Sequence, residues 1–165
     1  MKNNTIYVVD TPNIVRYKEN ILPRYFENYI ALLEFIIFNR STKFIVVVTP
    51  WLMKNLPNWW MMKSIRNLEF RLSSDYGIDP DVAIFEISKE ISDSIIISND
   101  KFRNSEYVKY NIEKNKLVGF EMVLDTDKLS WLLLKKNSNI KVTNYQKNIS
   151  EKIKVRNTKN YRRGN

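Results

Sequence analysis

Three short segments rich in β-branched residues alternate with longer helical segments along this chain. They read TIYVVD at residues 5–10, KFIVVVT at residues 43–49 and SIIIS at residues 94–98. The second segment has an uninterrupted apolar centre, which is typical of a strand in a sheet that is covered on both faces. Strands that alternate with helices in this order favour a parallel sheet. We therefore predict an α/β fold with three layers, α/β/α, around a central, mostly parallel sheet.

The segments between these strands carry the periodicity of helices. Residues 23–40 predict a helix on the spacing of four apolar side chains: Phe26, Ile30, Leu33 and Ile37. Residues 80–91 predict a second helix, and residues 104–115 predict a third, polar one. Shorter elements complete the pattern: a turn at 11–13, a loop with a short helix at 51–67, a strand at 68–73, and two strands at 117–124 and 128–134 joined by a turn at 125–127.

The net charge of +9 is confined to one end of the chain. Residues 1–134 contain 17 Lys and Arg against 17 Asp and Glu, whereas residues 135–165 contain ten basic residues and the single acid Glu151. We predict one domain over residues 1–134 and a basic C-terminal segment, partly extended or disordered, over residues 135–165. Such a segment binds a polyanion or serves as a solvated or membrane-surface tail, and we favour nucleic acid as its partner.

Two residue types are missing, which narrows the possible chemistry. The chain has no cysteine and no histidine. This excludes disulfides, thiolate or imidazole zinc sites and a Ser-His-Asp triad. The lack of cysteine fits an intracellular, cytoplasmic protein, and no apolar run is long enough to cross a membrane. Any catalysis must therefore use carboxylates, lysine, tyrosine, hydroxyl groups or a metal held by oxygen.

Two of the predicted strands run into an aspartate: the strand at residues 5–10 ends in Asp10, and the strand at residues 94–98 is closely followed by Asp100. The carboxyl ends of parallel strands lie at one edge of a sheet, so these side chains are expected to converge. Asp79 and Asp81 flank the proline that starts the second helix. Converging carboxylates repel each other unless a cation holds them, and Mg²⁺ and Mn²⁺ prefer such oxygen ligands. We predict a Mg²⁺ or Mn²⁺ site formed by Asp10, Asp100 and either Asp79 or Asp81.

Each of these aspartates also has a simpler structural explanation. Asp79 or Asp81 could cap the helix that follows, and Asp100 could do the same. Asp10 could form an Asx turn. The conjunction of two strand ends and one helix start is what favours a metal site over three separate caps.

Polar and basic side chains near these aspartates are candidates for binding a substrate. They are Asn13, Arg16, Ser98, Asn99, Lys101, Arg103 and Asn104. Lys101 and Arg103 could clamp a phosphate, or they could be exposed without a specific role. Ser98 and Asn99 could bind a phosphate, position Asp100 or simply form a turn. Trp51 could stack on a base, whereas packing is favoured for the tryptophans at positions 59 and 60.

Together, the motifs IYVVD-TPN, D-x-x-I at residues 81–84 and IIISNDKFR resemble the NYN branch of the PIN-like nucleases, most closely the Regnase-type ribonucleases. The likeness covers roughly residues 5–130. It implies a compact α/β/α domain, a Mg²⁺ or Mn²⁺ site of about four acidic residues, and endonucleolytic cleavage of RNA. Carried over by position, Asp10 and Asp100 are the firmest metal ligands. Asp81 follows, with Asp79 as the nearby alternative.

We therefore expect a metal-dependent endoribonuclease that acts on single-stranded RNA, with Asp10, Asp81 and Asp100 as catalytic residues. One alternative is a catalytically weak or silent RNA-binding module on the same fold, which is favoured by Asn104 standing where the family often has an aspartate. The other is a DNA-directed or structure-specific nuclease. The sequence is compatible with a homo-oligomer.

Overall fold

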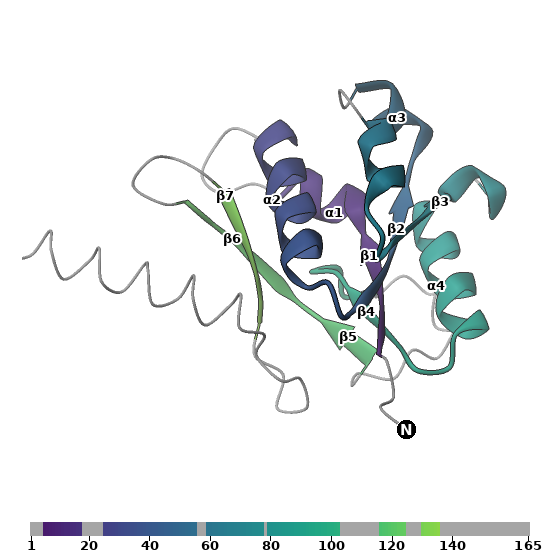
Figure 1. Ribbon diagram of the computed structural model, residues 1–165. Coiled ribbons are helices and arrows are strands. Elements are labelled where there is room, and N and C mark those ends of the chain that lie inside the picture. Colours follow the sequence, from purple (N-terminus) through teal and green to yellow (C-terminus); the bar gives the residue numbers. More distant parts are fainter. Residues whose placement is uncertain are drawn as a thin grey trace, which may run out of the picture.

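A five-stranded parallel sheet forms the centre of the computed structural model, which describes residues 5–17, 25–55, 59–77, 79–102, 116–124 and 130–135 (Figure 1). Its strands are β1 (Ile6–Asp10), β2 (Lys43–Val48), β3 (Leu68–Leu72), β4 (Ser94–Ile97) and β5 (Leu117–Val118). They lie in the order β3-β2-β1-β4-β5, and every neighbouring pair is parallel. The predicted α/β class is confirmed.

Helices cover both faces of this sheet. One face packs against α1 (Thr11–Val15), α2 (Tyr25–Phe38) and α3 (Pro50–Asn55), and the other packs against α4 (Pro80–Glu90). Successive strand residues point to opposite faces, and Val8 and Val9 of β1 accordingly belong to two different apolar clusters. Two short 3-10 helices, η1 (Trp59–Ser64) and η2 (Ser73–Asp75), flank β3. The predicted three layers are therefore present.

The segment 117–124, expected as one strand, is divided at Gly119. Before it, β5 continues the parallel sheet; after it, β6 (Phe120–Leu124) pairs with β7 (Ser130–Leu134) as an antiparallel hairpin on the α2 side. Gly119 is closely packed at this division, because a Cβ there would lie 3.0 Å from Asn99 Oδ1 and 3.0 Å from Lys135 Cδ. Glycine therefore suits the point where the chain leaves the parallel sheet and another segment approaches its backbone.

Helix α2 lies where the apolar periodicity predicts a helix. Most of the apolar side chains on which that prediction rests are, however, not the ones that α2 buries in the core. Phe26, Ile30 and Ile37 are 50%, 38% and 41% exposed. The fully buried side chains follow a second apolar stripe: Tyr29, Leu32, Phe35 and Ile36. A helix with two apolar stripes satisfies the same periodicity twice, so spacing alone could not choose its inner face.

Residues 11–13 were expected as a turn, and the structure instead starts α1 there. Asp10 caps this helix and Pro12 lies in its first turn, a combination that favours helix initiation. The predicted polar helix 104–115, the turn 125–127 and the basic segment beyond Lys135 fall outside the described residues. Within the described ranges, no helix is long and apolar enough to span a membrane.

One side-chain amide joins the end of α2 to the start of β2 and β3. Asn67 Nδ2 lies 2.9 Å from the carbonyl oxygen of Ile36, 3.1 Å from that of Asn39 and 3.0 Å from that of Thr42. The backbone oxygen of Asn67 also accepts from the Phe44 amide at 2.8 Å. This single residue therefore fixes how the first crossover helix returns to the sheet.

We predict that Asn67→Ala lowers the free energy of unfolding by about 2 kcal/mol, because it withdraws a donor shared by three backbone carbonyls. Urea denaturation monitored by circular dichroism measures this. Asn55→Ala is the matched control, since the Asn55 amide makes one exposed bond to the Trp51 carbonyl at 2.8 Å, and its loss should cost less than about 0.5 kcal/mol. Equal effects of the two substitutions would contradict the prediction.

Candidate active site at the switch point of the sheet

The strand order reverses between β1 and β4. From β1 the chain builds outward through β2 and β3 on one side, then returns to place β4 and β5 on the other. In the register of these two strands Val9 is paired with Ile97, so Asp10 and Ser98 follow side by side. A crevice beyond the carboxyl ends of strands at such a reversal is where open α/β sheets bind ligands.

Asp10 is a buried carboxyl group, only 3% exposed, and two groups hold it in place. The Asn13 amide donates to its Oδ1 at 3.2 Å, and the Ser98 hydroxyl donates to its Oδ2 at 2.6 Å. The Ser98 oxygen in turn accepts from the Asp100 amide at 3.0 Å. Ser98 therefore links the two aspartates at the strand ends, a positioning role that sequence reasoning had left open.

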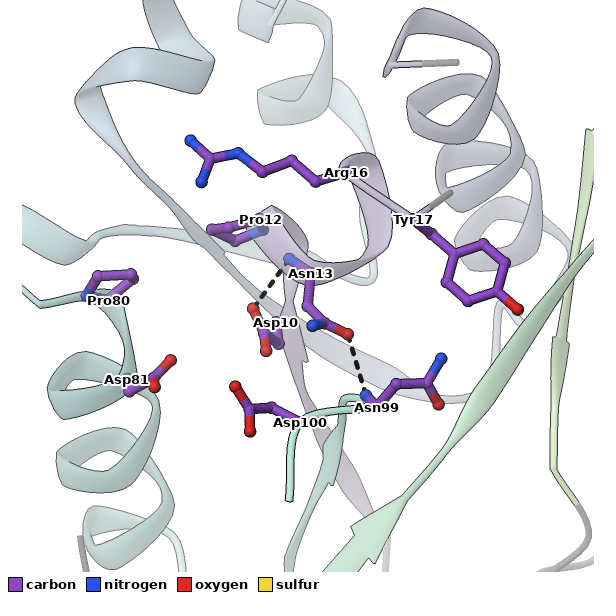
Figure 2. Close-up of a pocket in the computed structure, with 9 residues that line it drawn as sticks. All are labelled: Asp10, Pro12, Asn13, Arg16, Tyr17, Pro80, Asp81, Asn99 and Asp100. Atoms are coloured by element: carbon purple, nitrogen blue, oxygen red, sulfur yellow. Dashed lines mark hydrogen bonds between the residues drawn. The ribbon is translucent and has the colours of Figure 1, made fainter. Parts of the chain in front are cut away.

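Two asparagines tie the neighbouring loops together. The backbone amide of Asn99 donates to the side-chain oxygen Oδ1 of Asn13 at 3.0 Å (Figure 2). The Asn99 side chain pairs with the backbone of Phe120 through both of its polar atoms, Nδ2 donating at 2.9 Å and Oδ1 accepting at 2.9 Å. Both residues were predicted to bind substrate, and in this structure their side-chain oxygens hold the backbone around the site.

The structure distinguishes the two acids at the start of α4. Asp79 is the cap of this helix and accepts from the Asp81 amide at 3.0 Å. Asp81 lies in the first turn, and its side chain lines the pocket beside Asp100. Asp81 is therefore the member of the pair that faces the strand ends.

The carboxyl group of Asp100 is held by its own loop. Its Oδ1 accepts from the backbone amide of Phe102 at 2.9 Å, and Phe102 takes a positive φ of 44°.

The three aspartates surround one pocket of about 310 Å³ (Figure 2). They reach it from three separate elements: Asp10 from β1, Asp81 from α4 and Asp100 from the loop after β4. The remaining lining residues are Pro12, Asn13, Arg16, Tyr17, Pro80 and Asn99. The predicted convergence of Asp10, Asp81 and Asp100 at the carboxyl edge of the sheet is thus observed.

Burial raises the pKa of Asp10 to about 7 from an ordinary value of 3.8. The hydrogen bonds from Ser98 and Asn13 lower this pKa, while the negative charges of Asp81 and Asp100 raise it further. The two neighbouring carboxylates are thus close enough to act electrostatically on Asp10. Without a compensating positive charge, a pKa of about 7 keeps Asp10 mostly protonated at acidic pH and leaves it partly protonated near neutral pH.

The donor atoms of this pocket suit a hard cation. Among the described residues, no three acidic side chains form a preassembled metal cluster. Magnesium in phosphate-processing sites is usually held by one or two carboxylates together with water and substrate phosphates, rather than by an all-protein cage. Three carboxylates around an open pocket supply oxygen ligands of the kind that such an ion prefers.

The other predicted substrate-binding residues have different positions. Arg16 lines the pocket, and its guanidinium carbon lies 5.0 Å from the centre of the Trp51 ring. Lys101 is exposed just beyond Asp100 and is not among the lining residues, while Arg103 and Asn104 fall outside the described ranges.

Sequence reasoning missed Tyr17, which lines the pocket. The centre of its ring lies 5.3 Å from the centre of the Phe120 ring. Its only signal was its place directly after Arg16.

No protein-family model matches the chain, and no curated protein matches its sequence.

We predict that the metal-free protein loses stability as pH rises from about 4 to 7. Folding raises the pKa of Asp10 from 3.8 to about 7, so in this window the folded protein binds a proton that the unfolded chain releases. The proton's contribution is complete below the unfolded pKa and is lost as pH rises through the folded one, in total roughly 4 kcal/mol.

Urea unfolding at pH 5 and pH 8 in EDTA measures roughly 3 kcal/mol of this loss, because at pH 5 the carboxyl group of the unfolded chain is already mostly ionised. Asp10→Asn removes the titrating group, so its free energy of unfolding should change much less between the two pH values. Asp93→Asn, at an exposed carboxylate before β4, should behave like the wild type. A wild-type protein and an Asp10→Asn variant with the same pH dependence would contradict the assignment.

Proposed function

We propose that this protein is a metal-dependent endoribonuclease that hydrolyses phosphodiester bonds of single-stranded RNA. The observation that carries the proposal is the convergence of Asp10, Asp81 and Asp100 on one open pocket at the reversal of strand order. Residues on which the resemblance to the NYN branch of PIN-like nucleases rests, among them Asp10, Asn13 and Asp100, lie around this same pocket.

Asp10, Asp81 and Asp100 would hold the ion, Mg²⁺ or Mn²⁺. When bound, such an ion lowers the pKa of water and stabilises negative charge on a phosphoryl group. Ser98 keeps the Asp10 carboxylate oriented toward the pocket, and the Asn13 amide fixes its other oxygen. A positive charge in the pocket would offset the repulsion among the three carboxylates and favour the ionised form of Asp10.

Arg16 provides a positive charge on the wall of an otherwise acidic pocket. A guanidinium group binds phosphate oxygens through several directed hydrogen bonds. We assign Arg16 to the phosphate backbone of the RNA strand, where it would orient the chain relative to the carboxylates. The resemblance implies products with a 5′-phosphate and a 3′-hydroxyl group.

Cleavage of a labelled single-stranded RNA in Mn²⁺ or Mg²⁺ tests the proposal. We expect cleavage that EDTA abolishes and that Asp100→Asn or Asp81→Asn lowers by at least about a hundredfold, because a ligand of the reactive centre is lost. Asp93→Asn is the matched control, because it changes an aspartate at the opposite end of β4, and it should cleave normally.

The same assay separates the alternatives. Persistent cleavage in EDTA, or equal activity of Asp100→Asn and Asp93→Asn, would refute the proposed metal site. Bound but uncleaved RNA, with the fold intact, would favour the silent RNA-binding module. Equal cleavage of single-stranded DNA of the same sequence would widen the substrate class.

The affinity for RNA should depend strongly on salt, because the ten basic residues of segment 135–165 can displace counterions from phosphates. If about five of them contact phosphates, the logarithm of the association constant falls with the logarithm of salt concentration with a slope of about −3.5. Fluorescence anisotropy of labelled RNA with the full chain in EDTA measures the slope. A slope near zero would exclude the segment as an RNA-binding element.

A further inference from the structure

A cluster of one cation and two aromatic rings lies beside the carboxylate pocket. The guanidinium carbon of Arg16 is 5.0 Å from the centre of the Trp51 ring, and the rings of Trp51 and Tyr25 meet edge to face at 5.7 Å and 70°. The three residues come from the end of α1, the start of α3 and the start of α2. We name this cluster, Arg16, Trp51 and Tyr25, the aromatic platform.

The platform is open to solvent although its rings are large and apolar. Trp51 is 42% exposed and Tyr25 is 37% exposed. Helix α3 is anchored in the core by Leu52, which is fully buried, and not by Trp51. Trp51 instead lies outside the buried core cluster and contacts Arg16 and Tyr25 at the surface. Grouped exposed aromatic side chains generally mark a binding surface.

Arg16 belongs to both the pocket and the platform. Its side chain lines the pocket that Asp10, Asp81 and Asp100 surround (Figure 2), and its guanidinium group lies over the Trp51 ring. A ligand that enters the pocket and continues past Arg16 would therefore meet Trp51 next. Among the described residues, the order of chemical groups along this path is the acidic pocket, the Arg16 guanidinium group and the aromatic surface.

A single-stranded nucleic acid presents matching groups in that order. Its phosphates suit a cation-loaded carboxylate pocket and a guanidinium group, and its unpaired bases offer flat faces that stack on aromatic and guanidinium planes. In a duplex the bases are already stacked and paired, so they cannot use such a surface. The combination therefore selects an unpaired strand over a duplex.

We propose that the aromatic platform is a base-stacking subsite, in which Trp51 receives an unpaired nucleobase adjacent to the phosphate held at the pocket. The inference rests on the proposed function, because it takes the strand in the pocket to be nucleic acid. Beyond the proposed function, it assigns a binding role to Trp51 and predicts that the site prefers unpaired bases. Arg16 bridges the two parts of the site and aligns the stacked base with the phosphate beside it.

Binding measured in EDTA isolates the platform from any cleavage. The probes are a short single-stranded oligoribonucleotide, a strand of the same length with abasic sugars, and the corresponding duplex, each followed by fluorescence anisotropy at fixed salt with the full chain. We expect Trp51→Ala to weaken binding of the intact strand about tenfold, as loss of one stacked base typically does. Trp51→Phe keeps a ring and should retain most of the affinity.

Two comparisons make the expected result specific. The abasic strand and the duplex should bind Trp51→Ala and the wild type equally, because neither offers an unpaired base. Phe38→Ala is the matched surface control, since Phe38 is 64% exposed at the far end of α2 from Tyr25, and it should bind like the wild type. The salt dependence should be unchanged in Trp51→Ala, which alters no charge.

The outcomes separate the platform from the nuclease. Unchanged binding of the intact strand by Trp51→Ala, or an equal loss with the abasic strand, would overturn the base-stacking subsite even where cleavage still depends on Asp100. A wild-type protein that neither binds nor cleaves RNA would overturn both proposals together.

Discussion

The hydrogen bond from the Ser98 hydroxyl to the Asp10 carboxyl group, 2.6 Å long, is the contact on which the arrangement of the site depends. It crosses from β4 to β1 at the only place where the described strand order reverses. Because Ser98 also accepts from the Asp100 amide, one buried hydroxyl sets the relative position of two acidic residues. Strand pairing brings the two chain segments to the same edge of the sheet, and this hydroxyl holds the Asp10 carboxyl group and the Asp100 backbone in place beside the pocket.

Asn99 extends this control to the hairpin. Its side chain forms hydrogen bonds with both the backbone amide and the carbonyl oxygen of Phe120, as the backbone of a neighbouring strand would. Its backbone amide donates to the Asn13 side chain. The loop after β4 is therefore fixed on both sides, by α1 and by β6. The Asn99 side chain also lies close to the backbone of Gly119, where a Cβ would be 3.0 Å from its Oδ1. A rigid loop of this kind can present Asp100 at a constant position, which a catalytic constellation requires.

The first four strands, their parallel class and the convergence of aspartates could be predicted from the sequence, because β-branched runs and the carboxyl-edge rule act locally or through topology. The division of segment 117–124 into β5 and β6 could not. The choice between Asp79 and Asp81 could not, since both suit a helix start and only the direction of α4 shows that Asp81 faces the pocket. The inner face of α2 was also hidden, because two apolar stripes share its periodicity. The Asn99–Phe120 pairing joins residues 21 positions apart, and the close packing at Gly119 involves Asn99 and Lys135. No local pattern encodes either contact.

The site also shows a conflict between stability and chemistry. Burying Asp10 next to Asp81 and Asp100 raises its pKa to about 7, which disfavours the ionised form that would bind a cation. The cap that Asp10 provides for α1 needs only one of its carboxylate oxygens, the one that accepts from the Asn13 amide. The second oxygen accepts from Ser98, and together the two hydrogen bonds orient the carboxyl group toward an open pocket. Asp10 therefore combines a capping role in the fold with a strongly perturbed pKa of the kind that clusters at functional sites. A cation shared among the three carboxylates would relieve the cost, so ion binding and folding would stabilise each other at neutral pH.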